Sequence, residues 1–366
     1  MTLGLYLVRR LAGTFGLIAL VFFGMLLLFE TVELLRRFGG SEVGFGQILA
    51  LAALRVPATF YQILPLLVIL ASMATFLGLA RSSELVVMRA AGRSAMRMLR
   101  EPFVAMMLFG ALVVAGLNPL VAAASRAYQD RLAAIEFPDL QTQISLQGSA
   151  VWMRQGDATG QTVIRAQGID PDGLGFQGVS FLVFDRESGL PLRRIEAAHA
   201  RLEPGVWHLS EVKLWDLQAP NPEREAVLRP EMTMPSDLTG ERIRESLDRA
   251  GLQSVWNLPE FIAALDRAGL SSRPHRAQFM AELAQPLLFG AMLLVGAVLC
   301  FRHVRAGGAG MRILATVLAG FLLFFLRNFA QILGENGQIP LWLAIYTPPI
   351  ASMMLALGVL LHLEDG

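Results

Sequence analysis

A short charged segment between two long apolar stretches of the chain, residues 82–96, has the pattern of a binding helix. Ser82 or Ser83 can cap the helix N-terminus, and Glu84 falls in the first turn, where the helix dipole stabilises an anion. An apolar stripe follows, and the helix would close on a basic turn and a glycine. The residues that carry this pattern are Ser83, Glu84, Leu85, Met88, Arg89 and Gly92.

Two interpretations of this helix remain open at the level of the residues. Its arginines can hold it at the surface of an anionic membrane, as in an interfacial amphipathic helix. Alternatively, it is a coupling helix that inserts into a groove on a separate cytoplasmic subunit. The residue pattern favours neither.

Arg327 is a second chemical candidate, because it lies inside an apolar stretch. It follows Arg312 by 15 residues, and at about 1.5 Å per residue it would sit in the outer half of a membrane helix. An ionisable side chain at such a depth is a functional candidate by default. It can pair with Glu30 or Glu33 as a structural salt bridge, or it can face a cavity and bind an anionic ligand, which we slightly favour.

Two further arginines could extend a basic region on the same side of the membrane. Arg126 and Arg131 come just after the third apolar stretch. A solvated linker helix is the simpler interpretation of each of them taken singly.

Several kinds of chemistry are excluded by residue counts. Lys213 is the only lysine and lies in a strand-like segment, so the chain has no Gly-Lys-Ser/Thr phosphate-binding loop. Cys300 is the only cysteine, which rules out an intrachain disulfide and a cysteine-based metal site. The five histidines are scattered. We therefore expect no catalytic residues, no cofactor and no metal, and any ATP hydrolysis must come from a partner.

The elements that position these residues are expected to be membrane helices. Apolar residues make up 54% of the 366 residues and charged residues only 17%, whereas soluble domains have about 25% charged residues. A membrane helix needs about 20 apolar residues. Six stretches qualify, and the first is too long for a signal peptide. They are Leu11–Glu33, Val56–Ala80, Phe103–Val121, Phe279–Phe301, Met311–Leu333 and Leu341–Leu361.

The distribution of arginines predicts the orientation. Basic residues concentrate in the N-terminal tail and in the loops after the second and fourth stretches, and short loops rich in Arg face the cytoplasm. Both termini are then cytoplasmic, and Ala122–Arg276 lies outside.

The external segment differs in pattern. Apolar residues alternate with polar ones between Ala150 and Leu217, for example at Val206, His208, Ser210 and Val212, and turn-forming residues separate the runs. The spacing predicts a β-sandwich or jelly roll. The sequence thus predicts an α+β membrane protein with a β-sandwich or jelly-roll domain between the third and fourth of six transmembrane helices. Its parts are 1–121 with the short helix at 82–96, then 122–276, then 277–366.

The run from Ser83 to Gly92 resembles the signature of the lipopolysaccharide export permease family, LptF/LptG (also YjgP/YjgQ), and the resemblance extends over the whole chain. Some details are more similar to the G-type subunit. They are Glu84–Met88, Val151–Met153, Gly205–Ser210 and Asn336–Pro340.

The resemblance implies a function. Members of the family pair as an F–G heterodimer around a cavity in the bacterial inner membrane. A cytoplasmic LptB-type ATPase dimer grips a coupling helix of each subunit. The periplasmic β-jellyroll joins a bridge through LptC. Lipopolysaccharide enters between spans one and five of opposite subunits.

The resemblance also implies roles for particular residues. Glu84 would contact the ATPase groove, and Arg89 and Gly92 would shape the coupling helix. Arg36 and Arg37 match a basic pair that could meet lipid A phosphates. Some members have a basic residue where this chain has Glu30, so a role in binding lipid phosphates is in doubt at this position. The absence of that basic residue favours a role for Arg327 in compensating for it.

Other classes compete with a G-type transporter subunit. They are the paralogous F-type subunit, a non-transporting ABC-type mechanotransmission protein, and a membrane-anchored sensor or scaffold. Mechanotransmission proteins usually place their external domain after span one, and a scaffold needs neither an intramembrane arginine nor a coupling helix.

Overall fold

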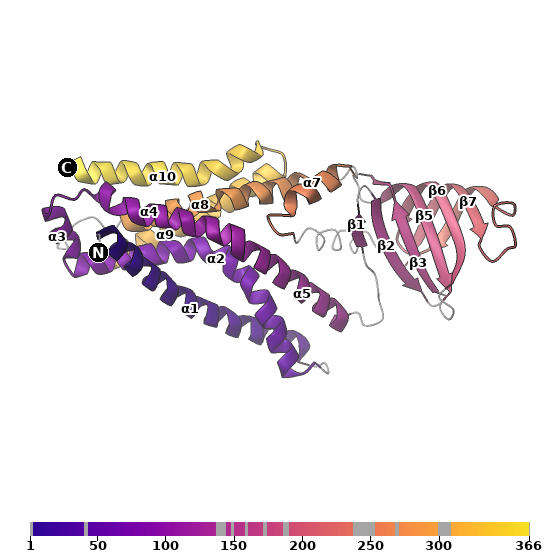
Figure 1. Ribbon diagram of the computed structural model, residues 1–366, viewed down its shortest axis with the longest axis horizontal. Coiled ribbons are helices and arrows are strands. Elements are labelled where there is room, and N and C mark those ends of the chain that lie inside the picture. Colours follow the sequence, from indigo (N-terminus) through magenta and orange to yellow (C-terminus); the bar gives the residue numbers. More distant parts are fainter. Residues whose placement is uncertain are drawn as a thin grey trace. The chain divides into compact units, whose positions relative to one another are not determined.

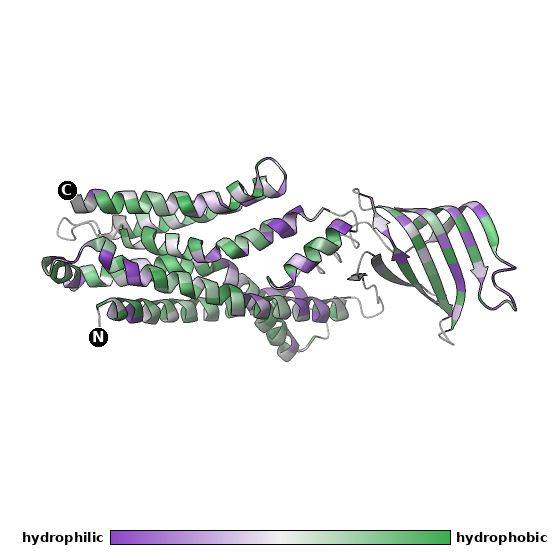
Figure 2. Cartoon of the chain, turned by 45° about the horizontal axis from the view of Figure 1, so that its top comes forward, coloured by the Kyte–Doolittle hydropathy of each residue, from purple (hydrophilic) through white to green (hydrophobic). Residues whose placement is uncertain are grey.

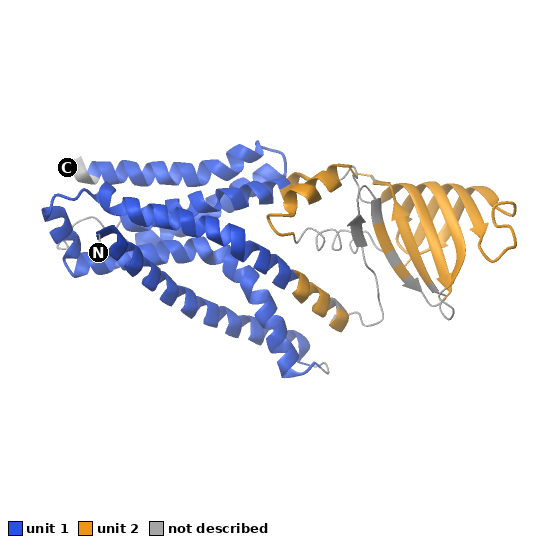
Figure 3. Cartoon of the chain, viewed as in Figure 1, with its two compact units in different colours: residues 1–125, 276–366 blue, residues 126–275 orange. Residues whose placement is uncertain are grey.

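The computed structural model describes residues 3–39, 43–136, 144–147, 150–157, 160–170, 174–185, 190–236, 253–267, 271–298 and 309–365. The chain divides into two compact units, residues 1–125 with 276–366, and residues 126–275 (Figure 3). The predicted end of the fourth span at Phe301, and Cys300 in it, lie outside the described residues. So do residues 171–173 and 187–189, which are among the turn-forming residues of the alternating segment.

Long apolar helices build the first unit (Figure 1). Its elements are α1 (Leu3–Phe38), α2 (Phe45–Arg81), α3 (Glu84–Ala90), α4 (Ala95–Leu112), the π-helical turn η1 (Val113–Leu117), the start of α5 (Asn118–Glu136), most of α8 (Arg273–Val298), α9 (Ala309–Glu335) and α10 (Leu341–Asp365).

Within the described residues, six helices are long and apolar enough to cross a membrane, which agrees with the predicted number. Figure 2 shows them predominantly hydrophobic along their length. The helices extend beyond several predicted apolar stretches: α1 begins at Leu3 and α2 at Phe45. Apolarity marks the part of a helix that suits lipid, whereas backbone hydrogen bonds carry the helix into the polar region beyond it. The π-helical turn in the third span was not predicted.

Close backbone contacts hold α2, α4 and α8 together. A Cβ on Gly110 would lie 2.6 Å from the Cα of Pro286, and a Cβ on Gly296 would lie 2.8 Å from the Ile69 carbonyl oxygen. Ser72 donates a hydrogen bond of 2.7 Å to the Leu293 carbonyl. Small residues allow helices to approach so closely. Membrane helices depend on such close packing, because the hydrophobic effect does not drive one helix onto another in lipid.

The helices of the first unit are buried to very different degrees. In the most apolar 18-residue window of each helix, 67% of the residues are buried in α2 and 72% in α8, but only 6% in α1 and 17% in α9. Thus α2 and α8 form the centre of the unit. The apolar flanks of α1 and α9 are left to lipid or to another protein.

A single antiparallel sheet dominates the second unit, in the order β1-β2-β3-β5-β6-β7-β8, with β4 paired to β5. The strands are β1 (Ile144–Gln147), β2 (Ala150–Asp157), β3 (Gly160–Ala166), β4 (Gly168–Ile169), β5 (Gly175–Asp185), β6 (Pro191–Glu203), β7 (Val206–Asp216) and β8 (Val227–Pro235), followed by α7 (Leu258–Arg267). One face carries an apolar core around Trp207, whose ring packs edge-to-face on Phe176 and Phe181 at 5.2 and 5.5 Å.

The alternation predicted along β7 is wrong in one respect. Trp207 and Leu209 are buried, and the next buried residue is Val212 rather than residue 211. Glu211 has φ of +54°, and Gly178 on β5, in line with it across β6, has φ of +58°. Before these left-handed residues the odd-numbered positions of β7 face the core, and after them the even-numbered positions do. Val212 therefore lies on the opposite face from His208.

Candidate functional site

The short helix of the 82–96 segment is smaller than predicted. Only Glu84–Ala90 is helical, and α4 begins separately at Ala95, where Ser94 accepts a hydrogen bond from the backbone N–H of Arg97. The predicted glycine cap is confirmed. Gly92 has φ of +78°, its N–H donates to the Arg89 carbonyl, and the N–H of the next residue donates to the Met88 carbonyl. This is the Schellman arrangement that ends a helix.

The predicted serine cap at the other end is wrong. Ser83 occupies the N-cap position in the left-handed region, with φ of 59°, and makes no side-chain cap. Ser82 instead donates to the Glu84 carboxylate at 2.7 Å. The left-handed residue turns the chain sharply between α2 and α3, so that α3 begins in a new direction.

Two faces of α3 have opposite environments. Leu85 and Met88 are buried in the apolar core of the first unit. Val86 and Val87 are 59% and 67% exposed. A short helix that holds its own position through one face and presents two valines on the other is suited to receive a second protein.

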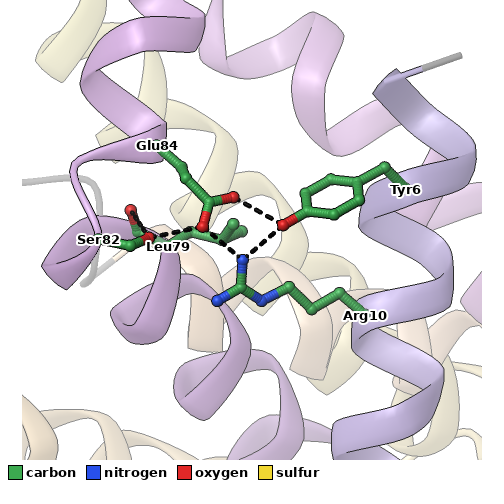
Figure 4. A network of polar contacts seen from close by, with 5 residues as sticks. All are labelled: Tyr6, Arg10, Leu79, Ser82 and Glu84. Carbon is green, nitrogen blue, oxygen red and sulfur yellow. Dashed lines mark hydrogen bonds and ion pairs between the residues drawn. The ribbon is translucent and has the colours of Figure 1, made fainter.

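Glu84 joins α3 to α1 (Figure 4). Arg10 donates to its Oε1 at 2.7 Å, and Tyr6 donates to its Oε2 at 2.7 Å. Arg10 also donates to the Tyr6 hydroxyl at 2.7 Å. The Arg10 guanidinium, then Tyr6 and Ser82, hold the pKa of the Glu84 carboxyl at about 2, well below its ordinary value of 4.5. Sequence analysis missed Tyr6 and Arg10, which are 78 and 74 positions away from Glu84.

Glu30 and Glu33 have other partners than Arg327. Glu30 accepts from Arg55 on α2 at 3.2 Å, and Glu33 pairs with Arg36 one turn further along α1 at 3.1 Å. The salt bridge considered between Arg327 and these acids is therefore wrong. The pair of Glu30 and Arg55 instead connects α1 to α2.

Arg327 lies near a different acid, Glu282 of α8, in a polar cluster inside the apolar helices. The guanidinium interacts electrostatically with Glu282 and Tyr61. Tyr61 of α2 donates a hydrogen bond to the Glu282 carboxylate, and the side chain of Asn118, at the start of α5, is hydrogen-bonded to both. The cluster thus connects four helices. Glu282 could have been found from sequence as the single acid of the fourth apolar stretch.

The remaining basic candidates lie at helix ends or on α5. Arg36 and Arg37 are exposed in the last turn of α1, and the Arg37 guanidinium lies over the Phe38 ring, 5.6 Å from its centre. Arg126 and Arg131 are exposed on α5, in the second unit. Among the described residues, no group of three or more His, Cys, Asp or Glu could hold a metal ion.

Comparison with known proteins found a family match over nearly the whole chain. Residues 5–362 match the family described as lipopolysaccharide export system permease LptF/LptG. No curated protein matches the chain. The family match covers nearly every helix and strand described above. The chain therefore belongs to the LptF/LptG family of lipopolysaccharide export permeases, multi-pass proteins of the inner membrane.

Proposed function

We propose that this chain is the G-type permease subunit of an exporter that extracts lipopolysaccharide from the outer leaflet of the inner membrane and passes it to a periplasmic bridge. It carries no ATPase motif, so we assign ATP hydrolysis to a separate LptB-type dimer and regard the chain as a non-enzyme. Its other partners are an F-type paralogue, and LptC with the bridge. The family match over residues 5–362 carries the assignment to a lipopolysaccharide exporter. The G-type assignment rests on the sequence details, such as Glu84–Met88, that resemble that subunit.

The exposed face of α3 supports the assignment of an ATPase contact. Val86 and Val87 project from a helix whose opposite face is fixed in the core, and apolar side chains on a helix are suited to a hydrophobic groove. The loop that contains α3 is rich in arginine, which favours a cytoplasmic location. Both termini then face the cytoplasm, and the second unit is periplasmic, where its sheet would serve as the jelly roll.

The low burial of α1 and α9 supports a substrate path at spans one and five. These helices leave their apolar flanks open in the isolated chain, and exposed apolar surface of this extent marks a site for lipid or for a partner. A heterodimer would enclose a cavity between them. Arg36 and Arg37 at the end of α1 would then be available to lipid A phosphates.

Purification of the tagged chain from its native membrane tests the proposal. We expect an ATPase, an F-type paralogue and an LptC-type protein to co-purify. Val86→Asp should abolish co-purification of the ATPase, because it places a charge in an apolar contact. Leu190→Asp, at a residue of similar exposure in the second unit, is the matched control. Co-purification of the ATPase with the Val86→Asp protein would contradict the docking surface.

The substrate path has its own test. Photocrosslinking groups placed on the exposed flanks of α1 and α9 should capture lipopolysaccharide, and Arg327→Glu should reduce this capture if Arg327 faces the substrate. Unchanged transport by Arg327→Glu would restrict Arg327 to a structural role. Two other classes have distinguishable outcomes: an F-type subunit would recover a G-type partner, and a mechanotransmission protein would recover an ATPase without crosslinked lipid.

A further inference from the structure

Both oxygens of the Glu84 carboxylate accept hydrogen bonds from side chains of this chain. One oxygen accepts hydrogen bonds from Arg10 and Ser82, and the other accepts from Tyr6, all at 2.7 Å. Figure 4 shows these donors converging on the carboxylate from α1 and from the turn before α3. Three of the roughly four acceptor sites of the carboxylate are thus used within the chain. The contacts therefore make Glu84 a tie between α3 and α1.

The N-terminal end and the middle of α1 have different environments. Leu7 and Leu11, which directly follow Tyr6 and Arg10 in the chain, are 1% exposed in the core, whereas Leu17, Leu20 and Val21 further along are at least 60% exposed. The end of α1 that carries the network is thus fastened to the body of the unit. The far end of α1 is also held, because Leu34 is fully buried and Glu30 pairs with Arg55 of α2 at 3.2 Å. The network therefore fixes one of the two ends between which the exposed middle of α1 runs.

The helix α3 is short and held on two sides. Leu85 and Met88 fix it to the core, and Glu84 fixes it to α1. Ser83 in the left-handed region and the Schellman arrangement at Gly92 separate it from α2 and α4. Side chains of α3 therefore transmit a force to two places. Leu85 and Met88 transmit it to the core, and Glu84 transmits it directly to α1.

We propose that Tyr6 and Arg10 are positioning residues that fasten α3 to α1 through Glu84, so that a displacement of α3 by the bound ATPase moves span one. This inference rests on the proposed function. It gives Glu84 a different role from the ATPase contact that the family resemblance implies. Docking then falls to the exposed valines, and Glu84 transmits the movement.

Charge reversal separates the two roles of Glu84. Arg10→Glu and Glu84→Arg should each lower lipopolysaccharide transport about fivefold or more, because like charges then face each other. The double variant should recover at least half of the transport, since the pair is restored in reverse and the Tyr6 hydroxyl can both donate and accept. The ATPase should co-purify with all three proteins. Arg9→Glu, which changes the charge of α1 equally at an exposed neighbour, is the control.

Two results would overturn the proposal. If the Glu84→Arg protein loses the ATPase and Arg10→Glu does not restore it, Glu84 contacts the ATPase. If the double variant transports no better than the single ones, the pair does not transmit movement. A second readout keeps the inference testable even if no ATPase co-purifies with the natural chain: a cysteine pair placed across α1 and α3 should crosslink less in each single variant and recover in the double variant.

Discussion

Replacing Glu84 by Gln should loosen α3 from α1 without changing its shape. The amide can still accept one hydrogen bond, but it removes the charge that faces Arg10. The lowering of the carboxyl pKa from 4.5 to about 2, at about 1.36 kcal/mol per pH unit, sets an upper limit of about 3.4 kcal/mol. Both side chains are about one third exposed, at 32% and 33%, and solvent screening reduces this to roughly 1–2 kcal/mol.

Hydrogen exchange of the full chain in lipid nanodiscs measures this effect. A loss of roughly 1–2 kcal/mol raises the local opening equilibrium about 5- to 30-fold, so amides of residues 84–92 should exchange faster by that factor. Amides in the centre of α8 are the internal reference and should not change. Exchange within twofold of the natural protein would refute the energetic account of the network.

The pH dependence of the same network follows from the direction of the pKa change. The folded pKa of Glu84 lies below its unfolded value, so the stabilisation is fully present above about 4.5. It is lost as the pH falls through about 2. Protection of α3, corrected for intrinsic exchange, should therefore be constant between pH 6 and 8. A change in this range would show that another group controls α3.

Three further predictions concern the rest of the chain. Trp207→Ala should lower the free energy of unfolding of the sheet by about 3–5 kcal/mol, since Trp207 is fully buried. Protease resistance of the sheet at increasing urea concentration measures this loss. An unchanged urea midpoint would contradict the prediction. Gly110→Ala should destabilise the helices by about 1–3 kcal/mol, because its Cβ would overlap the backbone of α8. Gly116→Ala, where a Cβ would meet open space, is the control. Equal thermal midpoints of the two variants would contradict the close packing at Gly110. Glu282→Leu should reduce the yield of folded protein, because it leaves the Arg327 charge without its acid. Adding Arg327→Leu to the same chain should restore the yield. Failure of this rescue would show that the two charges do not balance each other.

The membrane helices could be predicted because hydrocarbon imposes a requirement that each segment meets alone. A helix that crosses it must satisfy its own backbone and carry about 20 apolar residues, so six stretches were visible without any knowledge of their neighbours. The cap at Gly92 was predictable for the same reason, because its hydrogen bonds reach only a few residues along the chain.

The strands were partly predictable. Alternation identifies a strand with one buried face, but the row through Gly178 and Glu211 exchanges the two faces in the middle of the sheet. That exchange depends on backbone angles that alternation does not encode. Glu211 in particular is a residue type that rarely adopts the left-handed region.

The polar partners were decided by tertiary structure alone. Sequence identified Glu84 as the acid in the first turn of a short helix, and Arg327 as a charge inside an apolar stretch, where a charge is costly. Which group balances each charge depends on how the helices pack. Glu84 meets Arg10 across 74 positions and Glu30 meets Arg55, while Arg327 lies near Glu282. Composition thus determined that charges had to be paired, and the packing of distant helices chose the pairs.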